Sequence, residues 1–92
     1  MAKCVVLHST VPYSQDHDVA LKNALVPLPD LFAVVGVDCE AWEEAIDWLC
    51  VESSVYCNTT SHPQESLQEV IAFAEQWCEL KQWDKDVRVL EI

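Results

Sequence analysis

The side chains of this sequence that could do chemistry follow three short apolar runs. Nucleophilic, titratable and hydrogen-bonding types gather there, namely His8, Ser9, Asp38, Cys39, Asn58, Thr59, Thr60, His62 and Glu65. If the runs are parallel strands of one sheet, their carboxyl ends meet at a single edge, which is where open α/β sheets bind ligands. The sequence therefore predicts one candidate site, assembled from segments that are distant along the chain.

Cys39 is the candidate nucleophile of this site. It would lie at the N-terminus of a helix, where the helix dipole lowers the pKa of a thiol. His62 or His8 could then act as its base, in a cysteine–histidine arrangement. The same His8, Asp38, Cys39 and His62 could instead hold a transition metal.

Ordinary structural roles compete with this chemistry, and we prefer them. Asp38 and Thr60 are typical helix-capping residues, and loops at the edge of a sheet carry polar side chains in any case. We therefore assign no catalytic residue, metal or cofactor, and we keep Cys39, His62 and Asp38 only as catalytic candidates. A cluster with a structural or ligand-recognition role is the interpretation for His8, Thr60, His62 and Glu65.

Four apolar runs, at residues 4–7, 31–37, 55–57 and 87–92, are predicted to form the strands that position these side chains. The first three are short, nearly continuous and rich in valine, which is typical of strands buried on both faces. The last run includes Arg88 and Glu91, which indicates a strand at the edge of the sheet.

Three helices are predicted between the strands, at residues 14–25, 39–51 and 62–80. The first has only a weak apolar stripe, formed by Val19, Ala20 and Ala24. The second has a clear stripe at helical spacing, and Asp38 is placed to cap its N-terminus. That stripe consists of Trp42, Ile46 and Leu49. In the third, Ser61 and Gln64 have the spacing of a capping box, which places Glu65 in the first turns.

The alternating order of elements predicts a single α/β domain over residues 1–92, with a four-stranded, mainly parallel sheet and three helices (β-α-β-α-β-α-β). The 92 residues are 51% hydrophobic and 23% charged, which is a globular composition. Gly36 is the only glycine, so glycine-rich phosphate or dinucleotide loops are excluded in their standard form. Five widely spaced cysteines without an export signal or a membrane-spanning run predict a cytoplasmic protein with reduced thiols. Four of them lie in apolar runs and are expected to be buried, namely Cys4, Cys50, Cys57 and Cys78.

Negative charge is concentrated in the middle of the chain. The sequence has 16 Asp and Glu against 5 Lys and Arg, for a net charge of -11, and no Lys or Arg occurs between Lys22 and Lys81. This charge argues against direct binding of nucleic acid or of an anionic membrane, since both need clustered cations. A basic protein is the partner that the charge fits, and a homodimer is also compatible with the sequence.

The second helix carries the residues that we predict to bind this partner. They are Glu40, Glu43, Glu44, Asp47, Trp48 and Glu52. The alternative is an acidic face that serves only to keep the protein dissolved. Trp48 lies on the other side of the helix from Trp42, and core packing is its expected role. If Trp48 or Trp83 is exposed, however, it would make a good interface anchor beside the acids.

Residues 59–67, with the sequence Thr-Thr-Ser-His-Pro-Gln-Glu-Ser-Leu, resemble a T-T-x-H-x-x-E-S-L signature. That signature occurs in a family of small, acidic bacterial α/β proteins described only as a domain of unknown function. Residues 36–39, followed by Trp42 and Asp47, resemble the second block of the same family. Ser61 departs from the family pattern, which usually has an aromatic residue there. The resemblance implies an α/β fold and draws attention to residues 38, 39, 60, 62 and 65, but it implies no activity.

Two functional hypotheses follow. The first is a non-catalytic interaction protein that binds and inhibits or regulates a basic partner, as immunity proteins, antitoxins and phage-encoded inhibitors of defence nucleases do. The alternative is a small enzyme or ligand-binding module that uses the strand-end cluster around Cys39 and His62.

Overall fold

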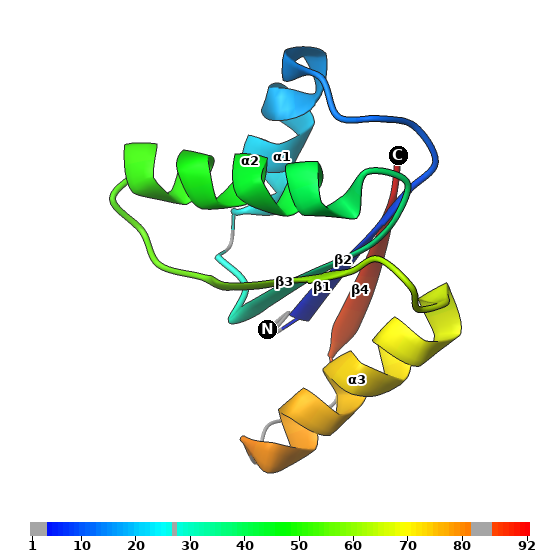
Figure 1. Ribbon diagram of the computed structural model, residues 1–92. Coiled ribbons are helices and arrows are strands. Elements are labelled where there is room, and N and C mark those ends of the chain that lie inside the picture. Colours follow the sequence, from blue (N-terminus) through cyan, green and yellow to red (C-terminus); the bar gives the residue numbers. More distant parts are fainter. Residues whose placement is uncertain (1–3, 27, 82–85) are drawn as a thin grey trace.

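One parallel sheet between two layers of helices forms the architecture (Figure 1). The computed structural model describes residues 4–26, 28–81 and 86–92. Its strands are β1 (Cys4–Ser9), β2 (Leu31–Gly36), β3 (Asn58–His62) and β4 (Val87–Glu91). They lie in the order β3-β2-β1-β4, and every neighbouring pair is parallel. The predicted α/β class with a four-stranded parallel sheet is confirmed, and β4 is an edge strand as expected.

The helices divide between the two faces of the sheet. A 3-10 turn, η1 (Gln15–His17), leads into α1 (Asp18–Ala24), and α2 (Cys39–Glu52) lies beside α1 on the same face. The third helix, α3 (Leu67–Leu80), covers the opposite face (Figure 1). The chain moves outward from β1 to β3 and then returns past β2 to place β4 beside β1. That return crosses the second face, which is why α3 lies opposite the other helices.

Alternate residues of β1 and β2 enter two separate cores. On the α2 side, Val5, Leu7 and Phe32 pack against Trp42 and Ile46. On the α3 side, buried residues of β1 and β2 pack against buried residues of α3. This second core consists of Cys4, Val6, Leu31, Ala33, Val35, Val70, Ala74 and Cys78. Burial on both faces explains why these two strands are continuous apolar runs in the sequence.

The third strand was predicted at the wrong residues. The apolar run at residues 55–57 is mostly a connection, in which Val55 is 39% and Tyr56 is 78% exposed, and the strand is the polar segment Asn58–His62 that follows. As an edge strand, β3 pairs with β2 alone, and four of its five residues are only half-buried. Such a strand needs few apolar side chains, and its β-branched threonines fit a half-buried pleated surface.

The start of α3 also differs from the prediction at residue 62. The helix begins at Leu67, and Ser66 caps it: the Glu69 N–H donates to Ser66 Oγ at 3.2 Å, and the Glu69 carboxylate accepts from the Ser66 N–H at 2.9 Å. Ser66 and Glu69 therefore form the capping box that we assigned to Ser61 and Gln64. Glu65 consequently precedes the helix.

The first helix is shorter than predicted, and its buried face is different. Val19 is 69% exposed and Ala20 is also exposed, whereas Leu21 and Leu25 pack into the core. The second helix matches its prediction, and its stripe of Trp42, Ile46 and Leu49 is buried. In the described part of the chain, no helix is long and apolar enough to cross a bilayer.

Gly36 ends β2 in a conformation that other residues rarely adopt. Its φ is +109°, and a Cβ added there would lie 2.3 Å from the Ser9 carbonyl oxygen, which is backbone and cannot move aside easily. The space also lets Ser9 donate a hydrogen bond to the Val37 carbonyl at 2.6 Å. The only glycine thus allows the carboxyl ends of β1 and β2 to come close together.

We expect Gly36→Ala to lower the free energy of unfolding by at least about 2 kcal/mol, because it adds both a backbone clash and an unfavourable φ. Ser54, a non-glycine residue at φ 56°, provides the opposite control, since Ser54→Gly should stabilise by about 0.5 kcal/mol. Urea unfolding measures both. A Gly36→Ala protein as stable as the wild type would contradict the argument.

The capping box predicts a specific dependence on pH. Hydrogen bonds from the Ser66 backbone and side chain lower the pKa of Glu69 below its usual value of 4.5. Its stabilising contribution is therefore present above about pH 4.5 and is lost as the pH falls through the lowered pKa of the folded state. Glu69→Gln keeps an acceptor but cannot titrate, so its Tm should fall less steeply between about pH 5 and 3. Glu75→Gln, on the same helix but outside the cap, should follow the wild-type curve.

Candidate functional site

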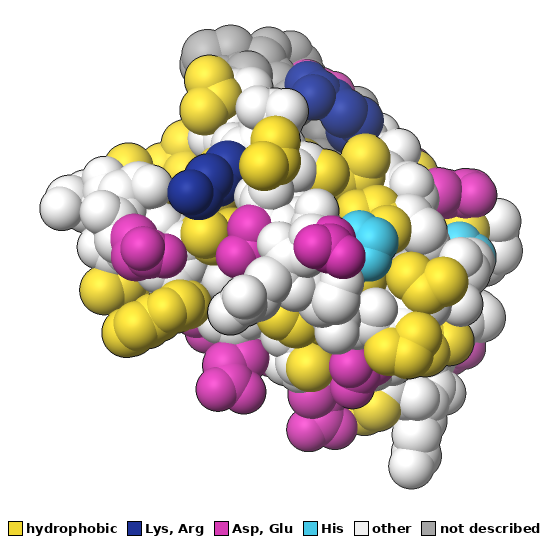
Figure 2. Space-filling view, turned by 90° about the horizontal axis from the view of Figure 1, so that it is seen from above, with side chains coloured by type: hydrophobic (Ala, Val, Ile, Leu, Met, Phe, Trp, Pro, Cys, Tyr) yellow, Lys and Arg dark blue, Asp and Glu magenta, His cyan; other side chains and the backbone are white. Residues whose placement is uncertain are grey.

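Of the six residues of α2 that are predicted to bind a partner, five are acidic. Glu40, Glu44, Asp47 and Glu52 are exposed, and Glu43 is half-buried. We call these five the acidic surface of α2. Viewed from the side of α1 and α2, Figure 2 shows carboxylates among apolar side chains across the middle and lower parts of this face, whereas the visible Lys and Arg lie in its upper part. Among the described residues, no acid of this surface pairs with Lys or Arg.

Trp48 is the sixth residue, and the expectation that it packs in the core is wrong. Its side chain is 66% exposed, whereas Trp42 is fully buried and donates its indole N–H to the Val11 carbonyl at 3.1 Å. Trp48 lies six positions after Trp42 on the helix, which turns the two indoles to different sides of α2. Trp83 lies outside the described residues.

A groove of about 650 Å³ opens beside Trp48. Most of its lining is apolar and comes from Tyr13, Ala41, Ala45, Trp48 and Val51. Gln15, Glu44 and Asp47 add polar groups. The groove therefore combines an exposed aromatic surface with carboxylates, and it lies between α2 and the segment that leads from β1 into α1.

Thr59 of β3 holds two carboxylates of the acidic surface through its hydroxyl group. Its hydroxyl lies 2.6 Å from Asp47 Oδ1 and 3.1 Å from Glu43 Oε2. A threonine hydroxyl has one proton to donate, so two anionic acceptors share one donor. The two carboxylates are held near each other although their charges repel, and Asp47 also lines the groove.

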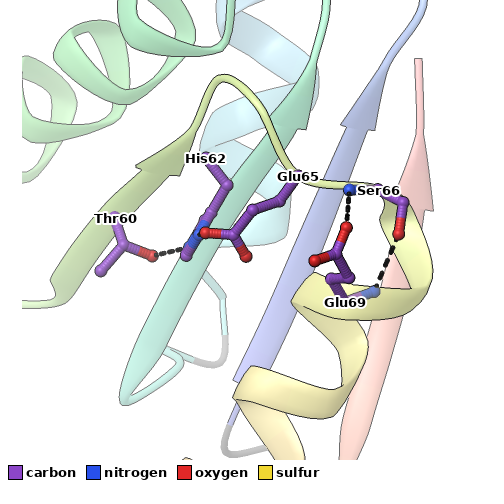
Figure 3. Close-up of polar contacts among 5 residues, drawn as sticks. All are labelled: Thr60, His62, Glu65, Ser66 and Glu69. Atoms are coloured by element: carbon purple, nitrogen blue, oxygen red, sulfur yellow. Dashed lines mark hydrogen bonds and ion pairs between the residues drawn. The ribbon is translucent and has the colours of Figure 1, made fainter.

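The structure brings together part of the second predicted cluster, at the end of β3 (Figure 3). His62 Nε2 lies 2.9 Å from Thr60 Oγ1, and His62 Nδ1 lies 3.1 Å from Glu65 Oε1. The His62 ring is buried and packs on Phe73 at 5.0 Å between ring centres. His8 lies on the same face of the sheet, but Val35 separates it from His62 in the register of the strands.

A hydroxyl, an imidazole and a carboxylate in this order resemble the arrangement in which a histidine activates a nucleophile. In the tautomer with a proton on Nδ1, Nδ1–H donates a hydrogen bond to Glu65, and Nε2 accepts one from the Thr60 hydroxyl. The same bonds also satisfy three polar groups and connect the end of β3 to the segment before α3. The arrangement thus supports both ligand recognition and a purely structural role.

The side chains of Cys39 and His62 lie on opposite faces of the sheet, so they do not form the predicted cysteine–histidine pair. The Cys39 side chain is 3% exposed and belongs to the core on the α2 side, whereas His62 packs against Phe73 of α3 on the other side of the sheet. Asp38 occupies the N-cap position of α2 in a left-handed conformation and forms no side-chain cap. Its carboxylate instead accepts the Tyr13 N–H at 3.2 Å. Among the residues that the structure describes, no group of three or more metal-ligating side chains comes together.

Sequence reasoning missed Tyr13, and it placed Thr59 only among the polar side chains at the strand ends, without its contacts to Glu43 and Asp47. Tyr13 donates its hydroxyl hydrogen to Asp18, and this hydrogen bond raises the pKa of Tyr13 to about 12. Its ring packs edge-on against Trp42 at 5.3 Å, so one wall of the groove is fixed. The contact of Tyr13 with Trp42 and those of Thr59 with Glu43 and Asp47 leave no periodic signal in the sequence, because only the fold brings these segments together.

Burial of the cysteines predicts slow thiol chemistry. All five are buried, and burial raises the pKa of Cys57 and of Cys4 to about 12 and also raises that of Cys50. We expect none of the five to react with a chromogenic disulfide at pH 8 as fast as a free cysteine, and all five to react in denaturant. One fast thiol that disappears in Cys39→Ser would restore Cys39 as a nucleophile.

Removing the Thr60 hydroxyl tests the cluster at β3. Thr60→Val keeps the shape but leaves the buried His62 Nε2 without a partner, so the free energy of unfolding should fall by about 1 kcal/mol. Ser61→Ala is the control on the same strand, and its effect should stay within about 0.5 kcal/mol. Equal effects of the two variants in chemical denaturation would show that the hydrogen bond adds no stability.

Comparisons with known proteins identify the family. Searches of curated proteins and of solved structures each gave no match. A family model described as "Domain of unknown function (DUF7684)" matches residues 3–92. The expectation of a family without an assigned function is confirmed, while the T-T-x-H-x-x-E-S-L pattern stays a prediction as its signature. Since the match spans nearly the whole sequence, the chain belongs to the DUF7684 family.

Proposed function

We propose that this protein is a non-catalytic interaction module that binds a basic protein partner through α2 and thereby inhibits or regulates it. The observation that carries the proposal is Trp48, which is 66% exposed beside a groove and among carboxylates that pair with no Lys or Arg in the described part of the chain. Tryptophans that bury on binding are enriched among the residues that dominate interface energies. Neighbouring carboxylates favour a cationic partner and disfavour an anionic one.

The acidic surface has a cost for folding that supports this function. Like charges three or four residues apart on one helix repel by a few tenths of a kcal/mol per pair. Interspersed lysines would remove this cost and keep the protein equally hydrated. A helix that omits them presents a continuous negative potential, which speeds encounter with a basic partner and makes the affinity depend on salt. Immunity proteins, antitoxins and inhibitors of defence enzymes are settings that such a module fits.

Charge reversal on α2 tests the proposal. Glu40→Lys/Glu44→Lys changes two exposed carboxylates, so the fold should survive. In affinity capture from host lysate, a basic protein should be retained at about 50 mM salt, released at about 500 mM, and lost with this variant. Glu75→Lys/Glu91→Lys makes the same change in net charge on exposed residues elsewhere and should retain the partner.

Retention that is equal for the two double variants would contradict the acidic surface as the binding site. Recovery of a second copy of the chain alone, with no other protein, would favour a homodimer instead. Sedimentation of the purified protein measures its oligomeric state and should accompany the capture experiment.

A small enzyme or ligand-binding module is the second candidate function, and the order of Thr60, His62 and Glu65 favours it. In that case His62→Ala should abolish the cellular function while Glu40→Lys/Glu44→Lys spares it. Far-UV circular dichroism and Tm establish whether the His62→Ala protein is folded. The opposite pattern of loss supports the interaction module.

A further inference from the structure

We propose that the groove beside α2 binds an amphipathic helix of the basic partner, with an arginine side chain stacked on Trp48 and paired with Glu44 and Asp47. This inference rests on the proposed function and adds the chemistry by which the partner is recognised. It comes from the lining of the groove, the spacing of residues on α2 and the charges at its rim.

The groove runs along a second apolar stripe of α2. Ala41, Ala45 and Trp48 follow one another at the spacing of residues on one helical face, next to the stripe that packs on the sheet. The alanines are small, and Trp48 and Tyr13 add aromatic surface to the lining of the groove. A partner helix that packs aliphatic side chains against these alanines would bury the exposed part of Trp48.

The charge of the rim selects a cation. Glu44 and Asp47 line the groove, and neither pairs with a Lys or Arg among the described residues. Asp47 Oδ1 is already held by Thr59 at 2.6 Å, so this carboxylate is oriented before a partner arrives. Because its side chain is immobilised in advance, less conformational entropy is lost on binding.

Arginine fits the combination of indole and carboxylates better than lysine. A guanidinium is planar, so it can stack on an indole face while its N–H groups donate to carboxylates at its edge. It is also more weakly hydrated than an ammonium and loses less on transfer into a partly apolar groove. Trp48, Glu44 and Asp47 offer these two kinds of contact within one groove.

The test uses a synthetic amphipathic peptide of about four helical turns, with leucines on one face and arginines flanking them. Isothermal titration measures its Kd, and the indole N–H signal of Trp48, assigned from Trp48→Phe, reports its environment by NMR. We expect Trp48→Ala to weaken binding at least about 10-fold, and replacement of the arginines by lysine to weaken it about 3- to 10-fold. Tyr56→Ala removes an aromatic residue that is 78% exposed but outside the groove, and it should bind as the wild type does.

Binding to Trp48→Ala as tight as to the wild type would overturn the groove as the site, and equal binding of the lysine peptide would overturn the preference for arginine. The captured partner separates this inference from the proposed function. Loss of the partner with Glu40→Lys/Glu44→Lys but not with Trp48→Ala would leave the acidic module standing and refute the groove. Peptide binding that needs Trp48, without any captured basic partner, would support the groove chemistry and refute the wider function.

Discussion

Burial of β1 and β2 on both faces is the constraint on which the rest of the structure depends. Each of these strands sends alternate side chains into two cores, so helices must cover both sides of the sheet. On one side, α2 commits Trp42, Ile46 and Leu49 to this task. The carboxylates and Trp48 lie on the remaining surface of α2, and the groove begins where Ala45 borders the core.

The sequence allowed prediction of those parts of the fold that burial encodes. The central strands are continuous apolar runs, and the core stripe of α2 repeats at helical spacing, so both were predictable. The strand β3 was not, because an edge strand is defined by its backbone pairing with β2 and needs little apolar surface. The start of α3 was misplaced for a related reason: Ser61 and Ser66 both precede a residue that suits a capping box, and only the end of β3 decides between them.

The candidate site shows the same division. The acids of α2 were predictable from their spacing, but whether Trp48 is buried depends on how α2 is rotated against the sheet and on what else covers it. Tyr13 and Thr59 act through contacts between distant segments. The sequence predicts only that Thr59 lies near a strand end, and nothing in it indicates these contacts. Places where local stability is sacrificed, such as the uncompensated acids of α2, are where functional demands are expected to show.

The polar composition of β3 affects whether the sheet can pair with strands of other protein chains. An open sheet has two edges whose backbone groups can pair with a foreign strand, which is a route to uncontrolled aggregation. Here one edge is a five-residue strand with the sequence Asn-Thr-Thr-Ser-His, and the other exposes Arg88 and Glu91. Short, polar or charged edges make extension of the sheet unfavourable. Backbone pairing with a foreign strand, which is indifferent to sequence, is therefore disfavoured at both edges, and side chains rather than strand edges are what this fold offers to other molecules.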